Sequence, residues 1–487
     1  MNWLNQFKSA LVSEDLDKIE YLTNHYPSKL NPDELECTAA LLKNSVELFR
    51  TKQKELEIEL SKAKKAKNNA LMSLSDRLIE FEKNATANGI KVHWASSATD
   101  ACEIIYELMR QNNIKKILKG KSMASEEIGL NHYLANKGLN AIETDLGELI
   151  IQLNDEAPVH IVVPAIHKNR NEIGKIFQEK LGADLENEPE KLNQIARKHL
   201  RDQFEGLEMG LSGVNFAMSK EGAFWLIENE GNGRMCTTAP QIHVALCGIE
   251  KVMESFEDAA TMVHLLTPSA TGQFIPTYNN IITAPRNEEL DGPKEVHLIL
   301  FDHHRSDMLA HHDYYEALRC IRCGACMNFC PVYDKIGGHS YQTIYPGPIG
   351  EVISPNIFGM EATGDILTFC SLCGRCSEVC PVRIPLADLI RKLRANKVGQ
   401  GKNPPLSTQN GHKNRGEAFA MKQFANVATN GALWRFSLSK AHLFNGALHK
   451  FQNSIPVIKN WSKYKELPQI KKDLYKELEN MEGVRYE

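Results

Sequence analysis

The stretch that decides the fold of the later half of the chain reads CIRCGACMNFCP over residues 320–331. The pattern returns as CSLCGRCSEVCP over residues 370–381. Both runs have the form C-x2-C-x2-C-x3-C-P, which is the spacing that holds [4Fe-4S] clusters. Soft thiolates suit the iron of these clusters, and the two-residue gaps let one loop place three sulfurs around one face of the cubane.

The fourth cysteine of each run lies beyond the reach of its own loop. In ferredoxins with two clusters this residue ligates the other cluster, and the proline after it stops the chain from continuing the turn. The spacing therefore predicts two [4Fe-4S] clusters with crossed ligands. We assign Cys320, Cys323, Cys326 and Cys380 to one cluster and Cys370, Cys373, Cys376 and Cys330 to the other.

Zinc is the alternative metal, because sites built from four cysteines are common. A zinc site would use two C-x2-C pairs and would leave the third cysteine, the fourth cysteine and the proline of each run unexplained. Disulfides are disfavoured in a cytosolic chain. The remaining cysteines, Cys37, Cys102, Cys236 and Cys247, occur in apolar contexts and are interpreted as small buried hydrophobic residues.

The two runs are separated by 39 residues, and the second leads into the helix-like sequence of residues 386–393. A long insert with helices favours an all-α, helical-ferredoxin type of dicluster domain over a compact β-type ferredoxin. We place this domain at residues 306–395. Two neighbouring low-potential centres are typical of proteins that carry electrons one at a time.

The sequence before the cysteine runs alternates between helix and strand patterns. Residues 48–88 are charged with apolar positions at helical spacing, which predicts a long amphipathic arm. Short apolar runs that predict strands follow at residues 92–94, 117–118, 141–144, 160–164 and 224–227. This alternation predicts an α/β domain over residues 71–305 after an N-terminal helical region at 1–70. A ligand in such a sheet usually lies at the carboxyl ends of the strands.

Length and composition fit a globular protein of several domains. The chain has 487 residues, of which 42% are apolar and 24% charged, and this excludes a disordered or fibrous protein. No apolar run is long enough for a membrane span and the start lacks a secretory signal, so we expect a cytoplasmic protein. The net charge of −4 gives no reason to expect nucleic-acid binding.

The charge is unevenly distributed. From residue 384 to the end there are 18 Lys and Arg against 8 Asp and Glu. We place a basic helical tail at residues 396–487 and consider two roles for it. It could dock on an acidic partner or on an anionic lipid surface as a peripheral membrane contact, or it could be a solvated helical tail.

Other motifs do not match known cofactor fingerprints. Gly120-Lys121-Ser122 resembles the end of a P-loop but lacks the first glycine of that motif. The segment 231–236 breaks the G-x-G-x-x-G pattern with Cys236, which disfavours a nicotinamide or flavin bound in that way. The histidines at 303–304 and 311–312 could bind a metal, but a solvated stretch is the favoured interpretation.

Many blocks in this sequence resemble one family. The LUD domain is similar to residues 121–131, 143–153, 164–170, 215–217, 228–234 and 248–251 of this chain, in that order. Joined to the two cysteine runs and to residues 337–339 and 345–350, the whole resembles the lactate utilisation protein B family, the iron-sulfur subunits of a three-part system that oxidises L-lactate. The match is strong over residues 75–395 and loose over the tail. Residues 1–50 and the His303-His304 loop depart from the family pattern.

The resemblance implies a fold and a function. It implies a NagB/RpiA/CoA-transferase-like domain followed by a helical ferredoxin, with lactate utilisation proteins A and C as partners and oxidation of L-lactate to pyruvate as the reaction. The first hypothesis is therefore an electron-transfer subunit of an L-lactate-oxidising complex, with the electron acceptor undefined. The alternatives are a redox-active scaffold, or a subunit for another 2-hydroxy acid such as glycolate or D-lactate.

The family-like blocks contain side chains suited to a 2-hydroxy acid. His167 could take the hydroxyl proton as a base, and Arg234 could hold the carboxylate as the second catalytic candidate. Lys168 and Arg170 are the candidate substrate-binding cations. In the competing interpretation, another subunit binds lactate and this chain only conducts electrons.

Overall fold

A computed structural model of the chain describes residues 56–120, 122–286, 291–399, 401, 408, 415–445, 450, 459, 462, 469 and 472. The described residues fall into two compact units, which divide between residues 397 and 398 with residues 401 and 408 belonging to the first. The expectations for residues 1–55, including Cys37, and for Lys121 lie outside the described residues. The predicted boundaries at 70, 305 and 395 stay predictions.

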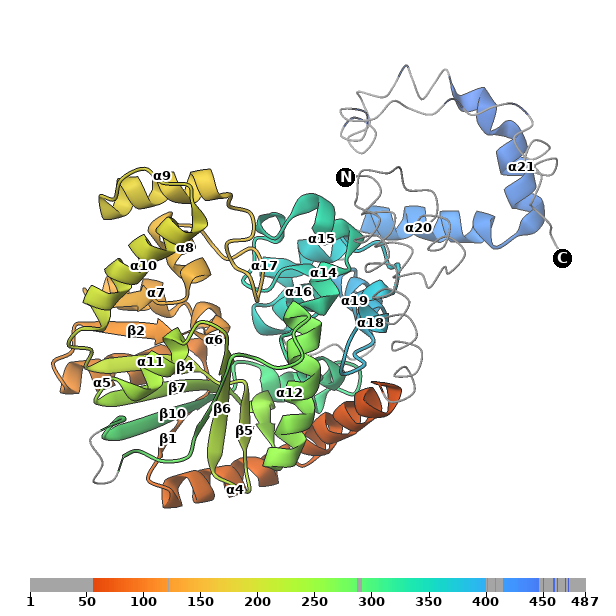
Figure 1. Cartoon of the computed structure of the whole chain (residues 1–487). Helices are drawn as coiled ribbons and strands as arrows, with labels where there is room; N and C mark the ends of the chain where they lie inside the picture. The colour runs from red at the N-terminus through yellow and green to blue at the C-terminus, as the bar shows by residue number, and fades with distance from the viewer. Residues whose placement is uncertain are drawn as a thin grey trace, which may run out of the picture. The chain divides into compact units, whose positions relative to one another are not determined.

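A six-stranded parallel sheet is the centre of the first unit (Figure 1). In spatial order its strands are β1 (Lys91–Ala95), β10 (Glu295–Phe301), β7 (Ile242–Gly248), β4 (Met209–Gly213), β2 (Lys116–Gly120) and β3 (Asn140–Glu143). All residues of β4 and β7 are buried. Parallel strands covered on both faces read as continuous apolar runs, which is why these segments lack strand-like alternation in the sequence.

Successive side chains of β7 and β10 point to opposite faces of the sheet and pack into two separate hydrophobic cores. Val244 and Leu246 point to the face covered by helices α5 (Ala98–Gln111) and α7 (Leu130–Asn136). Ala245 and Cys247 point to the opposite face, where α4 (Leu74–Ala87) and a second sheet pack. The helix before α4 covers residues 56–72, so the predicted amphipathic arm is helical over its described part.

The second sheet has four strands in the order β8 (Val252–Met253), β5 (Phe216–Met218), β6 (Ala223–Glu228) and β9 (Tyr278–Ile282). Strand β6 is antiparallel to both of its neighbours. Further helices of the α/β part are α6 (Met123–Glu127), α8 (Leu146–Leu153), α9 (Arg170–Leu181), α10 (Pro189–Phe204), α11 (Asn232–Thr238) and α12 (Phe256–Thr271). The fold is therefore mixed α/β with a parallel sheet, as the sequence predicted.

One predicted strand is wrong. Residues 160–164 were expected to be extended, but the structure has bends there. The reason is local, because the ring Nδ1 of His160 accepts hydrogen bonds from the backbone N–H groups of Val162 and Val163, both at 3.1 Å. These bonds turn the backbone away from any sheet.

The cysteine-rich part is helical and shares a core with the second sheet. Its elements are α13 (Arg305–Ala310), η2 (Tyr315–Arg319), α14 (Ala325–Asn328), α15 (Pro331–Ile336), η3 (His339–Tyr341), α16 (Gly347–Ile357), α17 (Met360–Thr363), η4 (Gly364–Thr368), α18 (Arg375–Glu378) and α19 (Leu386–Lys397). Met327 and Ile349 from these helices join Phe216, Trp225 and Met262 in one buried cluster. The all-α character expected for this part is confirmed.

The second unit contains α20 (Arg415–Ala428) and α21 (Gly431–Ala441). The side chain of Asn430 caps α21 by accepting from the backbone N–H groups of Ala432 and Leu433, both at 3.1 Å. The described residues of the predicted tail thus include two helices. Across the described residues, no helix combines the length and the hydrophobicity that a membrane span would need.

The buried His243 on β7 predicts a pH-dependent stability. It is fully buried and lies 2.8 Å from Ser212 through Nε2 and Oγ. Burial, with a smaller contribution from His297, lowers its pKa to about 3. Because a histidine in the unfolded chain has a pKa near 6.5, only the unfolded chain gains this proton as the pH falls from 7.5 to 5.5. The free energy of unfolding therefore falls by about 1.3 kcal/mol over that range.

We expect His243→Gln to remove that part of the pH dependence, as measured by urea unfolding at both pH values. His264→Gln, at an exposed position of α12, is the control and should behave like the wild type. An unchanged pH dependence in His243→Gln would show that this histidine is not held neutral.

Candidate functional site

The two cysteine loops have the same backbone conformation. Arg322 and Leu372 occupy equivalent positions and have φ values of 62° and 58°. Gly324 and Gly374, one residue after the second cysteine of each run, have φ values of 78° and 82°. Two left-handed residues within five positions curl each loop tightly. Arginine and leucine rarely adopt this conformation, so the fold must hold both of them there.

Backbone N–H groups point at the sulfurs in both runs. The N–H groups of Arg322 and Leu372 donate to the first cysteine of their run, at 3.4 and 3.3 Å. Those of Tyr333 and Ile384 donate to the fourth, at 3.5 and 3.3 Å. Such donors stabilise the thiolate that a metal requires and tune the potential of a bound cluster.

The sulfurs gather in two sets that cross between the runs. Burial raises the pKa of Cys326, and the next contributions come from Cys320, Cys323 and Cys380. Burial raises the pKa of Cys376 to about 12, followed by contributions from Cys370, Cys330 and Cys373. We call Cys320, Cys323, Cys326 and Cys380 the first sulfur set, and Cys330, Cys370, Cys373 and Cys376 the second sulfur set. This grouping is consistent with the crossed assignment, which stays a prediction.

The cysteine sulfurs of the described residues are not gathered as closely as a preformed zinc site requires. Zinc–sulfur bonds of about 2.3 Å place neighbouring sulfurs of a tetrahedral zinc site roughly 3.8 Å apart. In the described part of the chain, no three cysteine sulfurs lie within 4.8 Å of one another. A cubane needs wider spacing because its irons stand between the thiolates.

The two sets have different surroundings. The first set is mostly buried and lies near cations, since Cys320 acts to raise the pKa of both Lys67 and Arg322. The second set reaches the surface at Cys373, which is exposed. The first set therefore lies on the inner side of the dicluster part, and the second has access to solvent.

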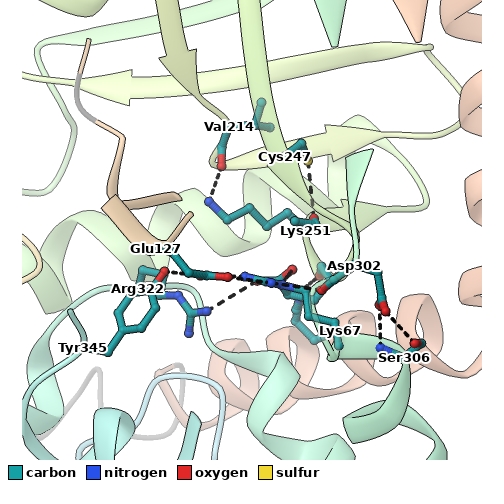
Figure 2. A network of polar contacts seen from close by, with 12 residues as sticks. Lys67, Glu127, Val214, Cys247, Lys251, Asp302, Ser306, Arg322 and Tyr345 are labelled. Atoms are coloured by element: carbon teal, nitrogen blue, oxygen red, sulfur yellow. Dashed lines mark hydrogen bonds and ion pairs between the residues drawn. The ribbon is translucent and has the colours of Figure 1, made fainter. Parts of the chain in front are cut away.

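A buried ion network attaches the first cysteine loop to the α/β part (Figure 2). Arg305 makes a bidentate ion pair with Glu127, with N–O distances of 2.8 and 2.9 Å. Its Nε also donates a hydrogen bond to the carboxylate of Glu250 at 2.5 Å. The hydroxyl of Tyr345 donates to Glu127 at 2.5 Å. Lys67 donates to the backbone carbonyl of Glu250 at 2.6 Å. The network thus joins the helix of residues 56–72, α6, the 3-10 turn η1 (Ile249–Lys251) after β7, α13 and the insert between the cysteine runs.

The network carries more positive than negative charge. Its cations are Lys67, Lys251, Arg305 and Arg322, and its carboxylates are Glu127 and Glu250. Burial alone would raise the pKa of Glu250, but the surrounding cations outweigh it and hold the pKa at about 2. Both carboxylates are therefore ionised. Burial lowers the pKa of Lys67 to about 8 and also lowers the pKa of Lys251, so the positive excess is greatest below pH 8.

Arg322 connects this network to the first sulfur set. It stands two residues after Cys320, its guanidinium lies 4.8 Å from the ring centre of Tyr345, and it is 3.5 Å from Glu250. Arg322 also lines a cavity of about 140 Å³. The other walls come from the start of α6, the loop after β4, the end of β6, residues 161–162, Lys251, the second half of α12 and Pro276.

The structure places the four other predicted residues away from this cavity. His167 and Lys168 both contact Glu156, at 2.7 and 2.5 Å, and His339 stacks edge-on against His167. Glu156, His167 and His339 each offer a ligand atom within 4.8 Å of the others, but Lys168 already occupies one oxygen of that carboxylate. This cluster is a contact between the α/β and cysteine-rich parts.

The two arginines are separate from that cluster. Arg170 is the first residue of α9 and is exposed. Arg234 is an exposed residue of α11 whose guanidinium lies 6.0 Å from the ring centre of Tyr278. The cavity lining includes none of His167, Lys168, Arg170 and Arg234 among the described residues. Their catalytic and binding roles stay predictions.

Sequence reasoning missed Arg322 and Lys251 as site residues. A signal existed for each, because Arg322 lies inside the first cysteine run and Lys251 ends one of the family-like blocks. Neither position could be joined to the other without the fold, since they are 71 residues apart.

Comparison with known proteins assigns the chain to a family. Residues 78–301 match the LUD domain, 316–384 the 4Fe-4S dicluster domain, and 392–484 the C-terminal region of lactate utilisation protein B. The chain is 41% identical over 377 residues to lactate utilization protein B of Macrococcus caseolyticus, covering 77% of each chain. The chain belongs to the lactate utilization protein B family.

Other relatives agree with this assignment. The chain is 37% identical over 417 residues to lactate utilization protein B of Bacillus cytotoxicus, covering 84% of this chain and 85% of the relative. It is 40% identical over 414 residues to the uncharacterized electron transport protein YkgF of Escherichia coli, covering 84% of each. Within this family the dicluster match identifies the cysteine-rich part as an iron-sulfur module. The LUD domain and the iron-sulfur character predicted from sequence are both confirmed.

Crossed ligation predicts a particular pattern of iron loss in double variants. Cys323→Ala with Cys380→Ala removes two ligands of the first sulfur set and should leave about four of roughly eight irons per chain. Cys373→Ala with Cys380→Ala damages both sets and should leave almost none. Iron analysis of anaerobically purified protein, normalised to protein concentration, measures both values. The reverse pattern would mean that each run holds its own cluster.

Proposed function

We propose that this chain is the iron-sulfur electron-transfer subunit of a multi-subunit L-lactate dehydrogenase, which oxidises L-lactate to pyruvate. The single observation that supports it most is the presence of two sulfur sets, one beside a partly open cavity and one reaching the surface. The names of the relatives, which refer to lactate utilization and electron transport, support the same proposal.

The electron count of the reaction matches two clusters. Conversion of L-lactate to pyruvate releases two electrons and two protons as the C–H and O–H bonds of the alcohol carbon are broken. When bound, each [4Fe-4S] cluster can accept one electron. The proposal therefore assigns one cluster to each sulfur set, giving two clusters per chain.

The residues of this chain bias the first sulfur set toward reduction. Lys67 and Arg322 lie near Cys320 in a buried region, where charges interact more strongly than in water. An added electron is stabilised by neighbouring cations, so the first set suits the receipt of an electron. The exposed Cys373 of the second set suits its transfer to an external acceptor.

The partners in this proposal are lactate utilisation proteins A and C. The second unit offers a surface for docking, because α20 and α21 expose Phe419 by 66%, Phe424 by 56% and Phe436 by 63%. Exposed aromatic groups gathered on two short helices are typical of an interaction surface. The basic charge of the tail adds attraction for an acidic partner or an anionic membrane surface. We place the complex in the cytoplasm, where thiols stay reduced.

The proposal predicts that L-lactate reduces the clusters. The chain would be combined anaerobically with proteins A and C, and EPR spectra would be recorded before and after L-lactate is added. We expect reduced-cluster signals with L-lactate and much weaker signals with D-lactate or glycolate at the same concentration. Cys323→Ala with Cys373→Ala, which breaks both sulfur sets, is the control and should give none.

Two results would contradict the proposal. If dithionite reduced the clusters but L-lactate with both partners never did, the clusters would serve structure or sensing. If glycolate or D-lactate reduced them faster than L-lactate, the electron-transfer role would stand but the substrate would be wrong.

A further inference from the structure

We propose that the cavity beside the first cysteine loop binds the carboxylate of the 2-hydroxy acid, with Arg322 and Lys251 as its cationic partners. The inference rests on the proposed function and deepens it, because it places the substrate on this chain. The cavity holds roughly ten times the volume that a single water molecule needs, which suits a small organic acid.

The location of the cavity favours a ligand. It opens where β4 ends, and the adjoining loop after β7 contributes Lys251. Ligands of parallel α/β sheets bind at these carboxyl ends. The opposite wall carries Arg322, from the loop of the first sulfur set. A molecule in the cavity would therefore contact both the α/β part and the first cysteine loop.

Both cations have donors to offer. Lys251 lies 2.5 Å from the backbone carbonyl oxygen of Val214, and an ammonium group has three N–H donors. Arg322 has five donors and makes its described ion pair with Glu250 at the long distance of 3.5 Å. A guanidinium and an ammonium that face one cavity can share the two oxygens of a carboxylate.

The positive charge of the surrounding network favours the binding of an anion. Lys67 and Arg305 are buried, Lys251 and Arg322 are partly buried, and they face the two buried carboxylates of Glu127 and Glu250. A buried charge without a partner is costly. A cluster held by the first sulfur set would be one such anion, because Cys320 lies close enough to Arg322 to raise the pKa of its guanidinium. Lys251 faces the cavity from the side of the sheet, so a carboxylate in the cavity is the anion that it can contact.

The rest of the lining is apolar or polar, apart from Glu228, whose carboxylate oxygens accept from the backbone N–H groups of Gly233 and Arg234 and from the amide of Asn280. Ile161, Ile227 and Leu266 supply apolar surface for a methyl group. Asn215 and Thr267 bring an amide and a hydroxyl that can bond the substrate hydroxyl. A small acid with one hydroxyl and a short apolar end therefore matches the cavity.

Binding of L-lactate to the full-length chain loaded with its clusters tests the site. Isothermal titration calorimetry under anaerobic conditions would compare L-lactate with 2-propanol, which lacks the carboxylate. We expect L-lactate to bind and 2-propanol to show no binding. Lys251→Met removes a cation, and Ala270→Leu fills the cavity from α12 without changing charge. Each should weaken L-lactate binding by about tenfold or more while iron content stays at the wild-type value.

Arg322→Gln should weaken binding similarly, and its iron content and reduction midpoint must be measured as well because it adjoins Cys320. Lys220→Met removes an exposed ion pair with Glu254 and is the matched control, which should bind L-lactate like the wild type. The inference is overturned if the wild type does not bind L-lactate, or if Lys251→Met and Ala270→Leu both bind it normally. It is also overturned if Lys251→Met shifts only the reduction midpoint, since the cation would then serve the cluster.

The outcomes separate this inference from the proposed function. If L-lactate binds as expected but never reduces the clusters with both partners present, the site stands and the proposed function fails. If L-lactate reduces the clusters of the complex while Lys251→Met and Ala270→Leu have no effect, the proposed function stands and another subunit holds the substrate.

Discussion

The structure depends on a limit to how far a cysteine loop can reach. Two left-handed residues curl each loop, and the proline after the fourth cysteine carries that sulfur away from the first three. This geometry favours the predicted arrangement, in which each run completes the other run's set. The helices between and after the runs must hold the loops side by side, and the buried packing of α14, α16 and α19 meets that need.

A second constraint ties the iron-sulfur module to the LUD domain. Arg305 is buried, and its charge is paired with Glu127 and Glu250, which come from distant parts of the α/β domain, while the backbone carbonyl of Asp302 accepts a further hydrogen bond at 3.1 Å. Loss of one member would leave another charge buried without a partner, at a cost of several kcal/mol. Tyr345 and Arg322 extend this network to the insert and to the first cysteine loop. The described residues of the LUD domain and of the cysteine-rich part accordingly form one compact unit.

Much of the architecture could be predicted from the sequence. The cysteine spacing predicted the iron-sulfur module that the dicluster match confirms, because ligand geometry is encoded locally in short gaps. The α/β class and the helical module also followed from local patterns. The strand expected at 160–164 was wrong because the imidazole of His160 captures backbone N–H groups, which an apolar pattern does not show.

The site around the cavity could not be predicted in the same way. Glu127 and Arg305 are 178 residues apart, and in the sequence each resembles a charged residue of an exposed loop. Only the fold shows that they neutralise each other while Lys251 and Arg322 face the cavity. His167 and Lys168 lay in a family-like block, yet both contact Glu156 instead of the cavity.

Diffraction at the iron absorption edge from anaerobic crystals of the full chain tests the crossed arrangement most directly. We expect two clusters of anomalous density, one bonded to Cys320, Cys323, Cys326 and Cys380 and the other to Cys330, Cys370, Cys373 and Cys376. Iron bonded by Cys330 together with Cys320, Cys323 and Cys326, or single metal ions in place of clusters, would contradict this account.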